Sequence, residues 1–301
     1  MKHLGTIQVL AATLALSLKG IWARLAYAEG LDVSGVLFYR SLFSAPLFLF
    51  IFALWRKKAD SFSSGLRTKD YLPGAALGLL FALGMFFDFE AIAQLGASIS
   101  RVVLFGFPLI VMVLTGVQRK QWPSWQKIGG FFLAWLGLFA VFDLHSGISL
   151  SQVRWALASM ATYALYVFLA EPVSRKLGSV RLTTTSNITT AVVVLSVILV
   201  MTRAEVPTLP NRSGLWMSLM VLVSTVIPYF LMMDGIRRLG SEGASLLAMV
   251  GPVMTVASAW LILGESLSGL QLLGTALTLG GVRLTQITSG RIDSQARRPA
   301  S

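Results

Sequence analysis

Charged side chains inside apolar stretches are the first candidates for chemistry in this sequence. Lys19, Arg40 and Arg101 lie within such stretches, and so do the carboxyl groups of Asp88 and Glu90. A charge at the bilayer centre costs roughly 2.5–3.5 kcal/mol on insertion scales, so each one needs a partner or a water-filled cavity. Basic groups in such a cavity bind carboxylate or phosphate. A buried carboxyl group beside bases can titrate when its exposure changes, which makes Asp88 and Glu90 candidates for proton coupling.

Lys19 is the deepest of the bases. A rise of 1.5 Å per residue places it about 13 Å from the outer end of its apolar run. Its helical face carries Trp22 and the small residues Ala12, Ala15 and Ala26, as a cavity wall would. We therefore predict that Lys19 binds the anionic group of a substrate, with Trp22 covering an apolar or planar portion.

Structural readings of the other charges stay open. Glu90 and Arg101 flank Leu95-Gly96 at nearly equal distances, so a turn there would let them form an ion pair on neighbouring helices. Arg24 lies close to the outer end of its run and could snorkel to the lipid headgroups.

The elements that carry these residues are predicted to be membrane-spanning helices. Hydrophobic residues make up 55% of the 301 residues, charged residues only 13%, and the mean hydropathy is +0.74. Apolar runs of about 20 residues are long enough to cross a bilayer. A β-barrel is excluded because runs such as Ala191–Val200 do not alternate. We predict an all-α fold with ten spans, at 7–28, 33–55, 71–93, 97–118, 127–143, 152–171, 182–202, 213–234, 241–263 and 268–288.

The basic residues predict how these spans are oriented. Of the 25 Lys and Arg residues, 18 fall in segments on the side of the N-terminus, three in loops on the other side and four within spans. This bias predicts an inner-membrane, multi-pass protein with both termini in the cytoplasm. It also accounts for the formal charge of +12 without a nucleic-acid partner. A count of nine spans would place the basic tail outside.

A fixed offset relates the two halves of the chain. Shifting by 144 residues places Gln94-Leu95-Gly96 on Arg238-Leu239-Gly240, and it aligns four further pairs: Glu90 with Asp234, Pro108 with Pro252, Gly130 with Gly274 and Gly137 with Gly281. We predict two five-helix repeats, 1–146 and 147–288, followed by a disordered cytoplasmic tail, 289–301. Five spans are an odd number, so the second repeat is inverted, an architecture typical of secondary transporters that work by alternating access.

The offset also places two aromatic residues opposite the candidate base. Tyr163 falls on Lys19 and Tyr166 falls on Trp22. The predicted substrate site therefore consists of one basic and one aromatic half, and would suit an amino acid or an organic anion. Its members are Lys19, Trp22, Arg40, Arg101, Tyr163 and Tyr166.

The second half resembles the EamA family of the drug/metabolite transporter superfamily. The resemblance rests on Leu239–Leu247, Pro252, Leu263–Leu267, Gln271–Gly274 and Gly280–Val282; the first half fits more loosely, with Gln121 where the second has Glu265. It covers nearly the whole chain and implies ten helices and export of amino acids or related metabolites.

Other function classes find less support. An enzyme would need convergent nucleophiles, bases or metal ligands, whereas the only histidines are His3 and His145 and there is no cysteine. A nucleotide-driven pump would need a Gly-rich phosphate loop, which is absent. We expect no catalytic residue, no metal and no cofactor, in a monomer or homodimer within the lipid bilayer. A flippase of an anionic lipid or lipid carrier remains the alternative.

Overall fold

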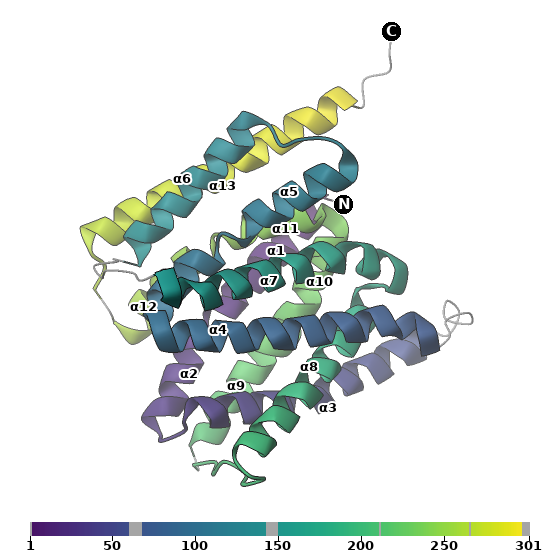
Figure 1. The fold of residues 1–301 in the computed structure, drawn as a ribbon, viewed down its shortest axis with the longest axis vertical. Helices are drawn as coiled ribbons and strands as arrows, with labels where there is room; N and C mark the ends of the chain where they lie inside the picture. Colours follow the sequence, from purple (N-terminus) through teal and green to yellow (C-terminus); the bar gives the residue numbers. More distant parts are fainter. Residues whose placement is uncertain (1, 60–67, 143–149, 211, 265, 297–301) are drawn as a thin grey trace. The chain divides into compact units, whose positions relative to one another are not determined.

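The computed structural model describes residues 2–59, 68–142, 150–210, 212–264 and 266–296, and within these ranges the chain forms helices and no strand (Figure 1). The all-helical prediction is confirmed. The α-helices are α1 (Lys2–Ser17), α2 (Lys19–Ala28), α3 (Val33–Ala59), α4 (Leu72–Leu104), α5 (Phe107–Arg119), α6 (Trp125–Val141), α7 (Leu150–Leu177), α8 (Ser179–Met201), α9 (Ser213–Val221), α10 (Ile227–Leu239), α11 (Ser241–Ala248), α12 (Gly251–Leu263) and α13 (Gly269–Ala296). A 3-10 helix, η1 (Thr68–Tyr71), precedes α4, and a π-helix, η2 (Leu222–Val226), joins α9 to α10.

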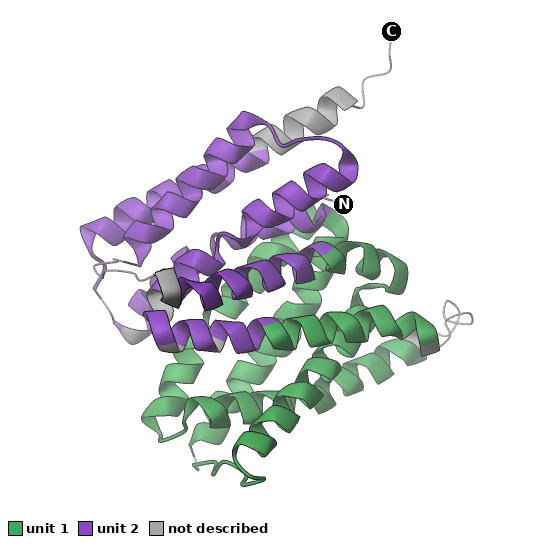
Figure 2. Ribbon diagram, viewed as in Figure 1, with its two compact units in different colours: residues 1–83, 169–238 green, residues 84–168, 239–301 purple. Residues whose placement is uncertain are grey.

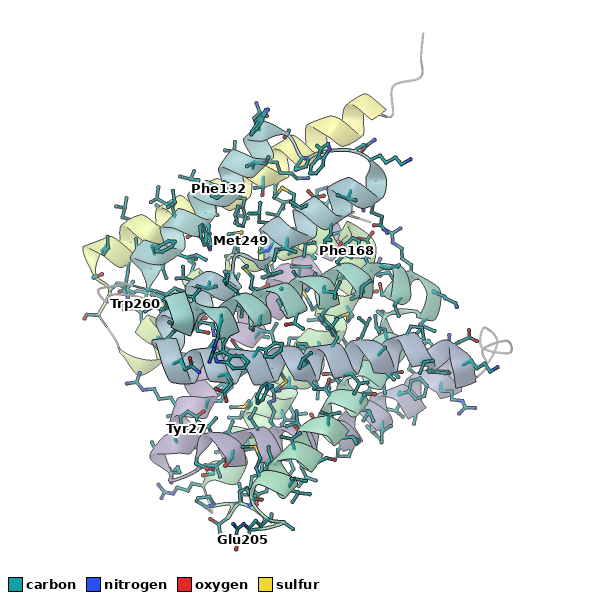
Figure 3. All side chains as sticks on the ribbon, viewed as in Figure 1. Tyr27, Phe132, Phe168, Glu205, Met249 and Trp260 are labelled. Atoms are coloured by element: carbon teal, nitrogen blue, oxygen red, sulfur yellow. The ribbon has the colours of Figure 1, made fainter. Side chains whose placement is uncertain are left out.

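Eight helical stretches of the described chain are long and apolar enough to cross a membrane. They are His3–Ala28, Val33–Arg56, Lys69–Ile92, Ile99–Arg119, Val153–Leu177, Ser179–Met201, Ser213–Leu239 and Ser241–Ile262, and Trp125–Val141 is a shorter apolar helix. The predicted span at 268–288 lies in α13, which is not among the eight. Large apolar side chains such as Phe132 and Trp260, labelled in Figure 3, are exposed on these helices. A multi-pass membrane protein explains this exposure, because such side chains face lipid tails.

The chain divides into two compact units, coloured in Figure 2. Unit 1 holds residues 1–83 and 169–238, and unit 2 holds residues 84–168 and 239–301. Each unit contains residues of both predicted repeats, so the repeats are not themselves the compact units. Helices α4 and α7 contribute to both units.

Glycines let the helices of unit 1 approach closely. A Cβ on Gly78 of α4 would lie 2.4 Å from the carbonyl oxygen of Ser186 on α8, and one on Gly235 of α10 would lie 2.4 Å from the side chain of Val9 on α1. Such contacts are typical of small residues in membrane helices, where backbones pack directly. They hold α8 against the first part of α4, and α10 against α1.

In unit 2, helices α6 and α13 run side by side (Figure 1). A Cβ on Gly137 would lie 2.7 Å from the carbonyl oxygen of Gly274, and one on Gly281 would lie 2.5 Å from that of Gly130. Gly130 and Gly137 therefore let the backbones of α6 and α13 pack directly against each other.

The 144-residue offset recurs in the backbone. Helices α5 (Phe107–Arg119) and α12 (Gly251–Leu263) have bounds that differ by 144 at both ends, and so do the starts of α6 and α13. The residues before the first pair have nearly equal angles, φ −72° and ψ −14° at Gly106 against φ −70° and ψ −15° at Val250. The residues after them, Lys120 and Gly264, are both left-handed, with φ of 53° and 70°.

The turn predicted at Leu95-Gly96 takes a different form. Helix α4 is continuous from Leu72 to Leu104 and includes Gly96. Gly240, which the 144-residue offset aligns with Gly96, instead follows the end of α10 and has a φ of +85°. Asp88 and Arg101 nevertheless touch, although 13 residues of straight helix would span about 20 Å. The helix therefore bends sharply between them, as helices can at glycine.

Helix α13 continues to Ala296, past Ser289, where the sequence predicts a disordered tail to begin. Residues 297–301, together with His145 and Glu265, lie outside the described residues.

Candidate functional site

Lys19 stands at an interruption between two helices of the first span. Helix α1 ends at Ser17, α2 begins at Lys19, and Leu18 between them is a turn residue. The amide of Ile21 donates to the carbonyl oxygen of Leu18 at 3.0 Å, so the chain resumes at once as a helix. The Lys19 side chain is half-buried in unit 1. Interrupted helices within spans are where transporters place substrate and ion sites, because the backbone polar groups released there can bind a ligand.

Trp22 lies one turn beyond Lys19 and is held by contacts from a distant part of the chain. Its indole Nε1 donates to Ser224 Oγ at 3.2 Å, and its ring stacks on Trp216 with centroids 6.3 Å apart and planes 13° apart. Ser224 is buried and belongs to the π-helix η2. π-Helical turns are frequent at functional sites. The predicted base and aromatic pair thus lies on α2, and Trp22 is anchored to a π-helix in unit 1.

Two of these contacts were missed from the sequence. Trp216 lies near the end of a predicted span, and it packs against the apolar cluster that includes Ala26, Phe38 and Met217. Ser224 had no sequence signal beyond the pair Ser224-Thr225 in an otherwise apolar run.

The other two bases of the sequence analysis that lie in unit 1, Arg40 and Arg24, differ in exposure. Arg40 on α3 is buried at 8% relative exposure, while Arg24 on α2 is exposed. The exposure of Arg24 agrees with the snorkelling interpretation.

In unit 2, Arg101 is paired with Asp88. Arg101 Nη2 donates to Asp88 Oδ2 at 2.6 Å across the bend of α4. The predicted pair of Arg101 with Glu90 is therefore wrong, because the bend brings Asp88, rather than Glu90, under the guanidinium group. Asp88 Oδ1 is buried and accepts no hydrogen bond from the described residues. Glu90 is half-buried on the same helix.

The two predicted tyrosines also belong to unit 2. Tyr163 and Tyr166 on α7 stack with centroids 6.2 Å apart, and Phe107 of α5 meets the Tyr163 ring edge-on at 4.7 Å. Tyr166 is buried. The structure thus brings Lys19 and Trp22 together on α2 and Tyr163 and Tyr166 together on α7, each pair within its own unit.

A further charged cluster is centred on Asp234 of α10, and it was not predicted from the sequence as a site. Its Oδ2 accepts from Gln8 Nε2 of α1 at 2.8 Å and from Arg238 Nε at 2.7 Å. Its Oδ1 accepts from Ser179 Oγ of α8 at 3.1 Å and from Arg237 Nη2 at 2.8 Å. One carboxylate therefore joins α1, α8 and α10 in unit 1.

Comparison with known proteins gives one family and several relatives. The model of the EamA-like transporter family matches residues 3–143 and again residues 150–287. The chain is 27% identical over 300 residues to the uncharacterized transporter YcbK of Bacillus subtilis (strain 168), covering 95% of each chain. It is 25% identical over 251 residues to the uncharacterized transporter YcxC of the same organism, covering 78% of each.

A crystal structure of another protein shares the fold. It matches with a TM-score of 0.73 at 15% identity, over 94% of this chain and 97% of that chain. The family model and the two relatives point to a membrane transporter of a small molecule rather than to an enzyme.

Proposed function

Because the chain belongs to the EamA-like transporter family, we propose that it is a secondary transporter of a small metabolite with an anionic group. The metabolite is an amino acid or an organic anion, it crosses the cytoplasmic membrane by alternating access, and the direction is export. The observation that carries this proposal is the position of Lys19, a half-buried base at a helix interruption beside the anchored Trp22.

The site around Lys19 has two attractive features for an anion. The ammonium group supplies a charge-assisted hydrogen bond. Lys19 is also the first residue of α2, and the N-terminal end of a helix favours negative charge. Arg40 is buried in the same unit and adds a second positive charge to its interior. Arg101, Tyr163 and Tyr166, the other members of the site proposed from the sequence, belong to unit 2.

The architecture that we propose is ten helices arranged as two inverted five-helix repeats, 1–146 and 147–288. Its support is the 144-residue offset of α5 with α12, and of the starts of α6 and α13. The basic residues support cytoplasmic termini in the inner membrane, as the positive-inside rule requires. Two copies with opposite topology supply inward-open and outward-open states of similar energy.

Proton coupling would run through the third span. Asp88, whose carboxylate pairs with Arg101 at 2.6 Å, is the first candidate for the coupling group. Asp88→Asn should abolish the response of transport to an imposed pH gradient, and Glu90→Gln is the second candidate. Full gradient dependence in both variants would remove these residues from the coupling step.

The test of the substrate site begins with an untargeted metabolite comparison of cells that lack and cells that overproduce the protein. Metabolites that change are then assayed for uptake into proteoliposomes. A charge-assisted hydrogen bond contributes about 1.5–3 kcal/mol, so Lys19→Met should weaken apparent affinity roughly ten- to a hundredfold. Lys19→Arg should keep part of the activity. Arg24→Met, an exposed base on the same helix, is the matched control and should transport as wild type.

A well-folded Lys19→Met protein with unchanged substrate affinity would overturn the proposed site. Proteoliposomes that scramble a labelled anionic lipid and take up no metabolite would instead establish the flippase alternative.

A further inference from the structure

Helix α8 is unusually polar for a span. Seven of the eight residues from 183 to 190 carry a hydroxyl or amide side chain, Ile188 being the exception. Most of these groups donate to backbone carbonyl oxygens; Thr190 Oγ1, for example, donates to that of Gly78 at 2.9 Å. Polar groups in a span are costly, mostly face the protein interior or water, and mark substrate paths.

The polar residues of α8 separate onto distinct faces. Thr185 and Ser186 pack against Gly74 and Gly78 of α4. Ile188 packs on the apolar cluster of Phe48, Val221 and Val226, and Thr184 shares its face because residues four apart align on a helix.

A third face carries Ser179, Thr183 and Asn187, again at intervals of four residues. Ser179 donates to Asp234, so this face begins at the Asp234 cluster. Asn187 is buried, and its Nδ2 donates to the carbonyl oxygen of Thr183 at 2.8 Å. The face therefore leads from a charged cluster into the middle of the span.

Two buried polar atoms, one on Gln8 of that cluster and one on α8 a turn beyond Ser179, lack a partner in the described part of the chain. They are Thr183 Oγ1, in a residue with 0% exposure, and Gln8 Oε1, whose amide nitrogen donates to Asp234. A buried hydroxyl or amide oxygen without a hydrogen bond is destabilising, and each such group in a native protein calls for an explanation. Water molecules, or a polar ligand that moves through this region, would supply hydrogen bonds to both atoms.

We propose that Gln8, Ser179, Thr183 and Asn187 line a hydrated path inside unit 1, with the Asp234 cluster at its mouth. Arg237 and Arg238 at that mouth belong to the basic segments that we place in the cytoplasm. In the transport cycle, the path lets water and the anionic group of the substrate exchange with the cytoplasm. This role rests on the proposed transport function, whereas hydration of the path can be measured by itself.

The absence of cysteine from the chain makes accessibility a direct test. Single variants Thr183→Cys and Asn187→Cys, in proteoliposomes, are exposed to a charged, membrane-impermeant methanethiosulfonate. They should react at least tenfold faster than Leu182→Cys and Thr184→Cys, and a substrate identified by uptake should slow the reaction. The controls are neighbours with 0% and 5% exposure, so burial in the structure does not distinguish them from Thr183. Reaction of Thr183→Cys no faster than that of Leu182→Cys would overturn the path.

A second pair of variants tests the hydroxyl group. Thr184 Oγ1 is also buried without a partner in the described residues, but it lies on the apolar face. Thr184→Val should therefore raise the melting temperature and leave transport unchanged, whereas Thr183→Val should lower transport several-fold and Thr183→Ser should restore it. If Thr183→Val is stabilised and transports normally, the hydroxyl is structural and the proposal fails. Fast reaction of Thr183→Cys together with normal affinity in Lys19→Met would instead defeat only the proposed substrate site.

Discussion

Thr278 on α13 donates its hydroxyl to the carbonyl oxygen of Ala134 on α6 at 3.3 Å, and the two residues are 144 positions apart. The contacts on either side follow the same relation. Gly130 meets Gly281 and Gly137 meets Gly274, so each contact maps onto the other when 144 is added to one residue and subtracted from its partner. This is the pattern of an isologous interface, in which residue i contacts j and j contacts i. Here it arises within one chain, around a local twofold axis between α6 and α13.

The glycines at this contact should be intolerant of a single methyl group. Gly137→Ala places Cβ 2.5 Å from Thr278 Oγ1, and Gly281→Ala places it 2.3 Å from the Ala134 amide nitrogen. Overpacking of this kind costs about 1–3 kcal/mol, so both variants should lower the melting temperature in detergent. Gly129→Ala and Gly280→Ala, where the added atom meets nothing within 4 Å, should be neutral or slightly stabilising. Equal effects in the two pairs would contradict the close contact.

The ion pair of unit 2 can be measured by a double-mutant cycle. Asp88→Asn, Arg101→Gln and the double variant should show a coupling free energy of about 0.5–3 kcal/mol in thermal or denaturant unfolding, since the charged atoms lie 2.6 Å apart. The parallel cycle with Glu90→Gln should show clearly weaker coupling to Arg101. A larger coupling for Glu90 than for Asp88 would show that α4 does not bend as described.

Ser224 should act as a positioning residue for Trp22. Ser224→Ala removes the acceptor of the indole N–H, a bond worth about 0.5–1.5 kcal/mol, so the tryptophan fluorescence should shift and apparent affinity should weaken up to about tenfold. Ser224→Thr keeps the hydroxyl and should recover much of both. Ser218→Ala on α9, whose hydroxyl donates to the carbonyl oxygen of Gly214 on the same helix, is the control. An unchanged spectrum and affinity in Ser224→Ala would rule out this role.

Membrane orientation is tested with reporter fusions. The distribution of Lys and Arg predicts that fusions after Lys58, Lys176 and Ser301 report the cytoplasm, while one after Glu205, labelled in Figure 3, reports the opposite side. Activity of an external reporter fused after Ser301 would imply an odd number of spans and remove the inverted repeat.

The sequence by itself determined the helical class, the positions of most spans and the 144-residue offset. These properties are local or periodic: apolar length decides whether a helix can span a bilayer, and small residues recur wherever backbones must approach. The same backbone angles before Gly251 and Phe107 therefore follow a repeat that was already visible in Pro108 and Pro252.

Only the tertiary structure decided which groups meet. Spacing favoured Glu90 as the partner of Arg101, but a bend in α4 selected Asp88, and the Trp22 indole found Ser224 at a separation of 202 residues. The Asp234 cluster likewise joins three helices whose sequences do not reveal that they are neighbours. A hydrogen bond or ion pair between two side chains forms only when their polar atoms come within hydrogen-bonding distance. A helix bend over a few residues therefore changes which side chain is the partner of a charged group, while the pattern of spans stays the same.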